Sequence, residues 1–144
     1  MANMIPKGTT PEGLNAFCDE TMVSHLGIQF TEVGEDYICA NMPVNQHTRQ
    51  PMGLLHGGAS VALAETLGSV AAALIAGMDK SVVGLEINAN HIRAKKEGIV
   101  TGKATPLHIG RTTQLWEIRI TDEDEKLICI SKITMAILEK KIQE

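Results

Sequence analysis

The sequence predicts an α+β protein in which one antiparallel β-sheet wraps around a single long helix. A 22-residue segment at 57–78 holds one charged residue, so it predicts a helix that is apolar on all sides and must be enclosed by the rest of the chain. Segments of strand composition follow it, and short polar turns such as Glu97-Gly98 favour antiparallel pairing. A length of 144 residues fits a single domain, residues 1–144.

The first 43 residues predict a short helix followed by a β-hairpin. Threonine, proline and glutamate at 10–12 supply an N-cap, a first-turn proline and a first-turn acid, so we expect a helix over residues 10–22. Two strands, at 27–33 and 37–42, flank a Gly-Glu-Asp turn. Because proline has no N–H to donate, Pro43 is expected to end the second strand.

The long helix is expected at about 57–77, where Gly77 is a natural C-cap. Such a helix is long enough to span about 30 Å of hydrocarbon. Glu65 near its middle, many small residues in place of Leu and Ile, and flanks without basic anchors argue against a membrane span. We therefore expect the buried helix of a soluble protein and no membrane partner.

The strands after the helix carry the alternation of a half-buried sheet. Trp116, Ile118 and Ile120 fall on one face of their strand, and the other face carries Leu115, Glu117 and Arg119. The expected strands are 81–93, 99–107, 112–121 and 127–138.

Charge and cysteine usage exclude several functions. The net charge of -4 argues against general nucleic-acid binding, which needs a basic surface. The charge is uneven, because residues 1–79 hold 2 basic and 8 acidic residues whereas residues 80–144 hold 11 and 9. Three cysteines without C-x-x-C spacing predict buried thiols, so we expect no metal site. The N-terminus has no apolar signal segment, so a cytoplasmic location is expected.

Glu65 is the most informative residue of the sequence. A charged carboxylate in the middle of an apolar helix costs several kcal/mol to bury unless a partner compensates it. Ser69, four residues further on, shares its helix face and is a candidate hydrogen-bond partner. The structural alternative is that Glu65 only reaches the surface or bonds a local backbone group.

The start of the long helix supplies a second candidate group. Gly57 and Gly58 open the helix, so their N–H groups are unpaired at the positive end of the helix dipole and can receive an oxygen that gains negative charge. His56 and Glu65 lie nine positions apart, on opposite sides of a helix and roughly 13 Å apart along its axis. If both serve one site, a second subunit of a two-fold dimer must complete it. Otherwise the glycines only permit a tight turn and His56 is structural.

A basic segment follows in the strand-rich half. Residues 91–111 hold five Lys and Arg and one acid, including a Gly-Arg-Thr turn at 110–112. Arginine and backbone donors of this kind suit phosphate groups. The alternative is a solvated basic strand end.

These motifs resemble those of the hotdog-fold acyl-CoA thioesterases. The resemblance is to the branch with a catalytic glutamate on the central helix, as in 4-hydroxybenzoyl-CoA and 1,4-dihydroxy-2-naphthoyl-CoA thioesterases. It rests on QPMGLLHGGASVALAE at 50–65, VVGLEINANHIR at 82–93 and PLHIGR at 106–111, and it extends from about residue 24 to 138.

The resemblance implies a role for each residue of the catalytic motif. Glu65 would be the nucleophile or the general base, and the two roles stay open. Gly57 N–H would polarise the thioester carbonyl. Gln50 and His56 would position the thioester from the partner's side of the site. Ser69 would orient the carboxylate or the water.

The resemblance also implies a coenzyme A site and an assembly. The site would combine the strand end, the Gly-Arg-Thr turn and Gly84 beside the pantetheine arm. Its other implied residues are His91, Ile92, Arg93, Ala94, His108, Ile109, Gly110, Arg111, Thr112 and Thr113. Coenzyme A is part of the substrate, so no separate cofactor is implied. The chain would form a homodimer with intersubunit active sites and, by dimer-of-dimers assembly, a homotetramer.

The implied reaction is hydrolysis of acyl-CoA, with aryl esters preferred, such as hydroxybenzoyl-CoA or the 1,4-dihydroxy-2-naphthoyl-CoA of menaquinone biosynthesis. Two alternatives stay open because a hotdog fold does not determine function. A hydratase or dehydratase would need a His-Asp or His-Glu pair that converges on the α and β carbons of the thioester. A non-catalytic acyl-CoA-binding domain would tolerate loss of Glu65.

Overall fold

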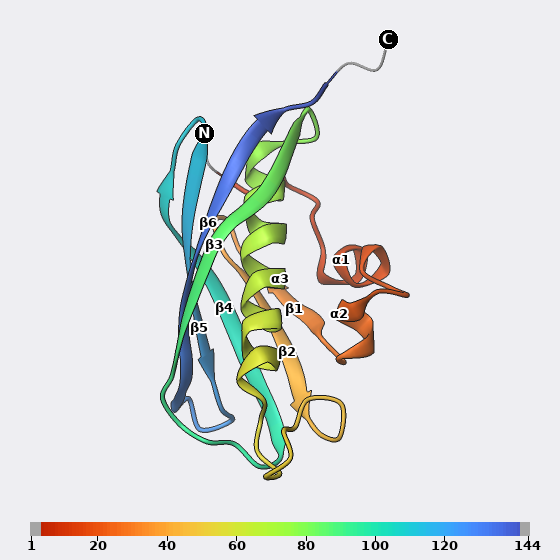
Figure 1. Cartoon of the computed structure of the whole chain (residues 1–144). Helices are drawn as coiled ribbons and strands as arrows, with labels where there is room; N and C mark the ends of the chain where they lie inside the picture. The colour runs from red at the N-terminus through yellow and green to blue at the C-terminus, as the bar shows by residue number, and fades with distance from the viewer. Residues whose placement is uncertain (1–3, 142–144) are drawn as a thin grey trace.

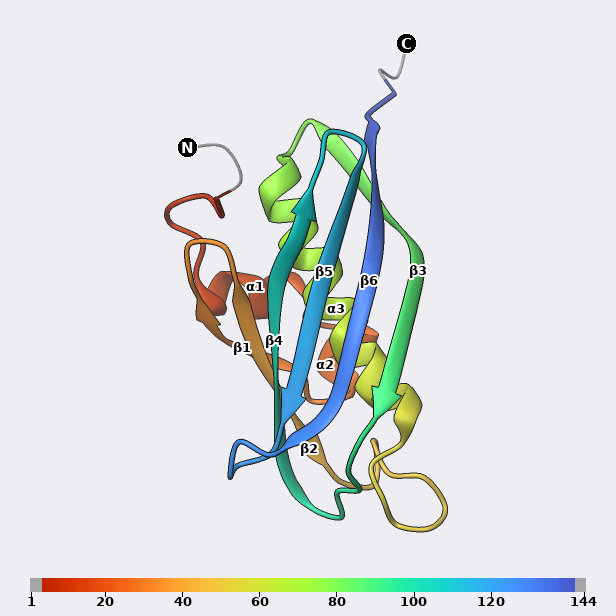
Figure 2. The ribbon, with the colours of Figure 1, turned by 90° about the vertical axis from the view of Figure 1, so that its left-hand side faces the viewer.

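A six-stranded antiparallel sheet packs against one long helix in the computed structural model, which describes residues 4–141. The strand order is β1-β2-β4-β5-β6-β3. Figure 1 shows the long helix α3 along one face of the sheet, and Figure 2 shows the sheet from its other face. The α+β class and the antiparallel hotdog architecture are therefore confirmed. The strands are β1 (Gln29–Val33), β2 (Ile38–Val44), β3 (Lys80–His91), β4 (Gly98–Ile109), β5 (Thr113–Thr121) and β6 (Leu127–Glu139).

Two short helices, α1 (Pro11–Phe17) and α2 (Met22–His25), replace the single N-terminal helix expected over residues 10–22. Thr10 caps α1, as the Thr-Pro-Glu pattern indicated. The expected continuation to residue 22 is wrong because Glu20 adopts φ 56°, in the left-handed region. Thr21 then starts α2 through a reciprocal capping box with Ser24, and this second cap marks a new helix.

Pro43 lies inside β2, so the prediction that it ends this strand is wrong. β1 pairs with β2 only as far as Asn41, whereas β4 pairs with β2 as far as Val44. At Pro43 the strand therefore has one neighbour, an arrangement that tolerates a residue without an N–H.

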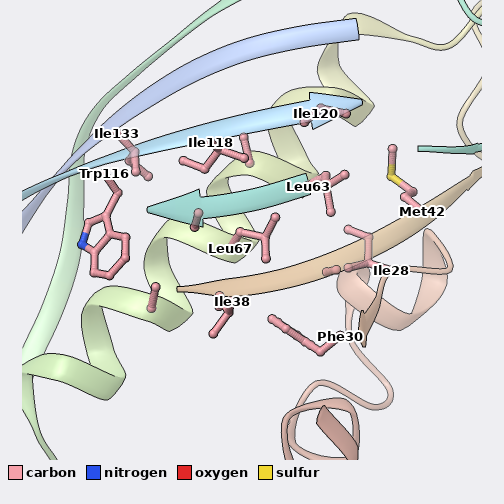
Figure 3. Packing of buried hydrophobic residues seen from close by; sticks show 14 of the residues in the cluster. Ile28, Phe30, Ile38, Met42, Leu63, Leu67, Trp116, Ile118, Ile120 and Ile133 are labelled. Atoms are coloured by element: carbon pink, nitrogen blue, oxygen red, sulfur yellow. The ribbon is translucent and has the colours of Figure 1, made fainter. Parts of the chain in front are cut away.

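The core lies between α3 (Gly57–Ala76) and the inner face of the sheet (Figure 3). Trp116, Ile118 and Ile120 of β5 are fully buried, which confirms the predicted alternation. Small residues let the helix approach the sheet closely. At Gly68 an added Cβ would collide with the side chain of Ile133, so any larger residue there would push α3 away from β6.

Within residues 4–141, α3 is fully buried on the side that packs on the sheet but only partly buried on the other side, so the enclosure expected on all sides is incomplete. The side that packs on the sheet includes Ala64 and Leu67, both fully buried. On the other side Glu65 and Ser69 are half-buried and Ala73 is exposed. The length and apolar composition of α3 would permit a membrane span, but α3 is the core helix that packs on the sheet.

β3 is a 12-residue strand at the edge of the sheet. Its exposed side chains include Val83 and Leu85, which are 45% and 62% exposed. A bulge between Gly84 and Glu86 interrupts its pairing with β6. The strand ends at His91 and not at residue 93 as predicted, so the following basic residues lie in the loop 92–97.

Candidate active site

The start of α3 presents one free backbone donor. His56 is the N-cap, and its Nδ1 accepts a hydrogen bond from Gly58 N at 2.8 Å. The prediction that both glycine N–H groups are unpaired is therefore wrong for Gly58. The N–H of Gly57 has no acceptor among residues 4–141. Because it lies at the positive end of a 20-residue helix, it can donate to an oxygen that gains negative charge.

A cavity of about 350 Å³ lies beside this helix start. The loop before α3, the first turn of α3 and the end of β3 with its following loop form its walls. The fold thus brings the predicted helix-start residues and one of the two predicted coenzyme A segments together. The predicted residues that line the cavity are Gln50, Gly57, His91, Ile92, Arg93 and Ala94.

Close packing determines where two of these side chains lie. A Cβ added to Gly57 would lie 2.9 Å from Nε2 of His91, so the imidazole rests directly against the helix start. Gln50 Oε1 accepts a hydrogen bond from Met52 N, which turns the amide back toward its own loop. His91 and Gln50 therefore flank the free N–H of Gly57 from β3 and from the loop before the helix.

Glu65 lies two turns further along α3, on the uncovered side of the helix, and does not line this cavity. A Cβ added to Gly84 would lie 3.1 Å from Glu65 Oε1, so the carboxylate rests over the backbone of β3. Among residues 4–141, Glu65 has no hydrogen bond or ion pair from a side chain. Ser69 does not bond it here, because its hydroxyl lies 4.0 Å from the sulfur of Met135.

The two catalytic candidates are separated within one chain. Glu65 follows Gly57 by eight residues, which is about 12 Å along the helix axis and about 80° around it. The carboxylate lies beside Gly84 and the helix start lies beside His91, so the two groups also meet β3 at different positions. One chain therefore does not assemble a complete site from these groups.

The second predicted coenzyme A segment, residues 108–113, lies at the opposite end of the sheet from His91 (Figure 2). Thr113 and Val83 both pair with Ala136 of β6, so the turn 108–113 lies level with Val83. Val83 is about 25 Å from His91 along β3. Arg111 and His108 are exposed, and Gly110 N closes the turn by donating to Thr113 O at 2.8 Å. One chain does not bring the two basic segments to one place.

Sequence reasoning missed four residues that line the cavity. Ser60 is one helical turn after Gly57, so helical spacing was a signal for it. Leu54 and Leu55 lie within the motif at 50–65 but carry no chemical signal of their own. Ile128 comes from β6, and only the pairing of strands distant in sequence brings it there.

None of the three cysteines lines this cavity, and all three are buried and free. Burial raises the pKa of the Cys39 thiol to about 11 and also raises the pKa values of the Cys18 and Cys129 thiols. Such thiols are poor nucleophiles near neutral pH. Within residues 4–141, no three His, Cys, Asp or Glu side chains are grouped so that they could hold a metal ion.

A six-stranded antiparallel sheet wrapped on one 20-residue central helix is the fold of the hotdog thioesterases. The family model of the thioesterase superfamily matches residues 52–129, and the chain belongs to this superfamily. It is a thioester hydrolase, with acyl-CoA as the substrate class of the family.

Individual relatives match nearly the whole chain. The 1,4-dihydroxy-2-naphthoyl-CoA hydrolase of Escherichia coli is 53% identical over 129 residues, which cover 90% of this chain and 95% of that protein. The proofreading thioesterase EntH of Cronobacter sakazakii is 54% identical over 129 residues, with 90% and 94% covered. The crystal structure of a thioesterase from Haemophilus influenzae superposes with a TM-score of 0.90 at 51% identity, with 92% and 93% covered.

Proposed function

We propose that this protein hydrolyses aryl-CoA thioesters, with Glu65 as the nucleophile or general base and Gly57 as the donor to the thioester carbonyl. The observation that carries the proposal is the carboxylate of Glu65, which lies on an apolar helix beside the open backbone of Gly84 and has no side-chain partner among residues 4–141. A carboxylate in this position is free to attack a bound acyl group or to take a proton from water.

Either role completes a balanced hydrolysis. As a nucleophile, the carboxylate forms a mixed anhydride with the acyl carbon, the C–S bond breaks, and water then cleaves the anhydride. As a general base, Glu65 takes a proton from the water that attacks the same carbon. In both routes the sulfur leaves as the thiolate of coenzyme A and gains a proton. The N–H of Gly57 stabilises the negative charge on the carbonyl oxygen.

Pairing of two β3 edges would complete the site. Two copies of β3 can pair antiparallel about a two-fold axis that is perpendicular to the sheet. When this axis passes between Ile87 and Asn88, His91 of one chain lies level with Gly84 of the other. That register brings the partner's Gly57 toward Glu65 and pairs the open edge of β3. It also places both copies of α3 on the same face of a continuous sheet, so their uncovered sides meet.

The same dimer would unite the two basic segments. The partner's turn 108–113 then lies at the sheet end that carries Arg93, three strand spacings away, about 14 Å. We propose that Arg93 and Arg111 of different chains hold the phosphates of one coenzyme A and that His56, Gln50 and Ser69 position the thioester and the reacting oxygen. Assembly into a tetramer and a cytoplasmic location complete the proposal.

The aryl preference draws its support from the relatives, one of which has the name of a 1,4-dihydroxy-2-naphthoyl-CoA hydrolase. Release of free thiol from benzoyl-, hydroxybenzoyl-, naphthoyl- and straight-chain acyl-CoA tests it. We expect the highest kcat/KM with the aryl esters. Release from no ester would contradict the hydrolase mechanism, and faster release from straight-chain esters would contradict only the aryl preference.

Arg93→Ala and Arg111→Ala should each raise KM for benzoyl-CoA about tenfold, because each removes a charge-assisted hydrogen bond to phosphate. The matched substrate is the N-acetylcysteamine ester of benzoate, which has the same thioester but no phosphates. Its KM should change less than the KM of benzoyl-CoA. Equal effects on the two substrates would show that these arginines do not bind phosphate.

A further inference from the structure

The loop 92–97 carries the cavity residues Ile92, Arg93 and Ala94 but has no regular secondary structure. All three side chains are exposed, so little packing holds them. The geometry of the coenzyme A end of the cavity therefore depends on how this loop is tied to the rest of the chain.

Backbone bonds tie the two halves of the loop to different neighbours. Ile92 N and Arg93 N both donate to Ile128 O of β6, at 2.8 and 3.3 Å. Further along, Leu55 N donates to Lys95 O at 2.7 Å, so the loop also joins the segment that precedes α3. Leu55 and Ile128 themselves line the cavity, and the loop is thus part of its wall on both sides.

A side-chain ion pair adds a third tie at the middle of the loop. Lys95 Nζ lies 2.5 Å from Glu123 Oε1, which belongs to the turn between β5 and β6. The lysine side chain is only 18% exposed, unlike an ordinary surface lysine. The other carboxylate oxygen, Oε2, accepts from Ile99 N at 3.3 Å.

Glu123 is itself held in place by the loop end. Gly98 has φ 87°, and any Cβ there would collide with the Glu123 carboxylate, which lies flat against the glycine backbone. The hydrogen bond from Lys95 lowers the pKa of Glu123, and the same bond raises the pKa of Lys95, so both stay charged near neutral pH. A single carboxylate therefore joins Lys95, Gly98 and Ile99 across the start of β4.

We propose that the Lys95–Glu123 pair is a positioning device that holds loop 92–97, and with it Arg93, in the place where the phosphates of coenzyme A bind. This inference rests on the proposed acyl-CoA hydrolysis. Neither residue touches the thioester, so their effect is on binding of the coenzyme A portion and not on the chemical step.

The test compares benzoyl-CoA with the N-acetylcysteamine ester of benzoate. Glu123→Ala and Lys95→Met should each raise KM for benzoyl-CoA about three- to fivefold, the range expected when one ion pair of this kind is lost. The kcat of both substrates and KM for the truncated ester should stay within about twofold of wild type. The exchange Lys95→Glu with Glu123→Lys should return KM for benzoyl-CoA to within about twofold of wild type.

Asp124→Asn is the matched control, because it removes one charge from an exposed residue next to Glu123 that makes no side-chain hydrogen bond or ion pair with the loop among residues 4–141. It should leave both KM values unchanged. If Lys95→Met raises KM while Glu123→Ala leaves or lowers it, Lys95 binds phosphate directly and the positioning role is overturned. Equal effects on both esters would overturn it too, because they would show a general structural role.

Titration calorimetry with free coenzyme A separates this inference from the proposed hydrolysis. If wild type binds coenzyme A and Glu123→Ala binds it about three- to fivefold more weakly, the positioning role stands even if no ester is cleaved. If esters are cleaved and both variants bind and turn over like wild type, the positioning role alone fails. Absence of coenzyme A binding by wild type would overturn the positioning role, and release of thiol from no ester would overturn the proposed hydrolysis.

Discussion

Glu65→Gln is expected to lower kcat for benzoyl-CoA by about a thousandfold or more, while the Kd of coenzyme A stays within twofold of wild type. Glutamine has nearly the same shape, so it still fits beside Gly84. It neither attacks a carbonyl carbon nor takes a proton from water at neutral pH. The loss therefore falls on the chemical step, whether Glu65 is the nucleophile or the general base.

Steady-state thiol release gives kcat for this comparison, and calorimetry with coenzyme A gives the Kd. Glu117→Gln on β5 is the control, because it makes the same charge change on the face of the sheet that points away from α3. A Glu65→Gln enzyme with at least a tenth of the wild-type kcat would contradict a chemical role for this carboxylate. Transfer of an oxygen from Glu65 into the acid during a single turnover in ¹⁸O-water would identify the anhydride route.

The regular elements were predictable because their signals are local. Alternation along β5 and the long apolar run of α3 follow from periodicity and length alone. The end of the first N-terminal helix could not be predicted, because local composition does not exclude Thr21 from a helix. The left-handed backbone of Glu20 and the capping box of Thr21 with Ser24 show that one helix ends there and another begins. The prediction for Pro43 was wrong because it considered β2 alone. Whether β2 tolerates a proline depends on a second strand, namely on how far β1 extends beside β2.

The site was predictable as a set of groups but not as an arrangement. Glu65 stood out because a charge interrupts an apolar helix, and Gly57 because glycines open it. The sequence does not show that His56 accepts a hydrogen bond from the N–H of Gly58 and none from Gly57, because this depends on side-chain geometry. The Lys95–Glu123 pair joins residues 28 positions apart in sequence, and no local pattern distinguishes it from the other charged residues nearby.

A dimer that joins two inactive chains should recover activity if the site lies between subunits. One chain carries Glu65→Gln and keeps the helix-start residues. The other carries Gln50→Ala with His56→Ala and keeps Glu65. Alone, each variant should lose most of its activity, the first through the chemical step and the second through positioning of the thioester.

Co-expression with two different tags and purification through both isolates the heterodimer. One of its two sites then combines an intact Glu65 with intact helix-start residues from the other chain. The second site has neither group intact. The kcat per dimer should therefore be about half of wild type. A heterodimer of two Glu65→Gln chains, purified in the same way, should stay inactive. If each site used groups of one chain only, the mixed dimer would hold one defective site of each kind and show no more than the mean activity of the two parents. That result would contradict the proposed β3 pairing, because pairing across β3 is what brings the partner's Gly57 to Glu65.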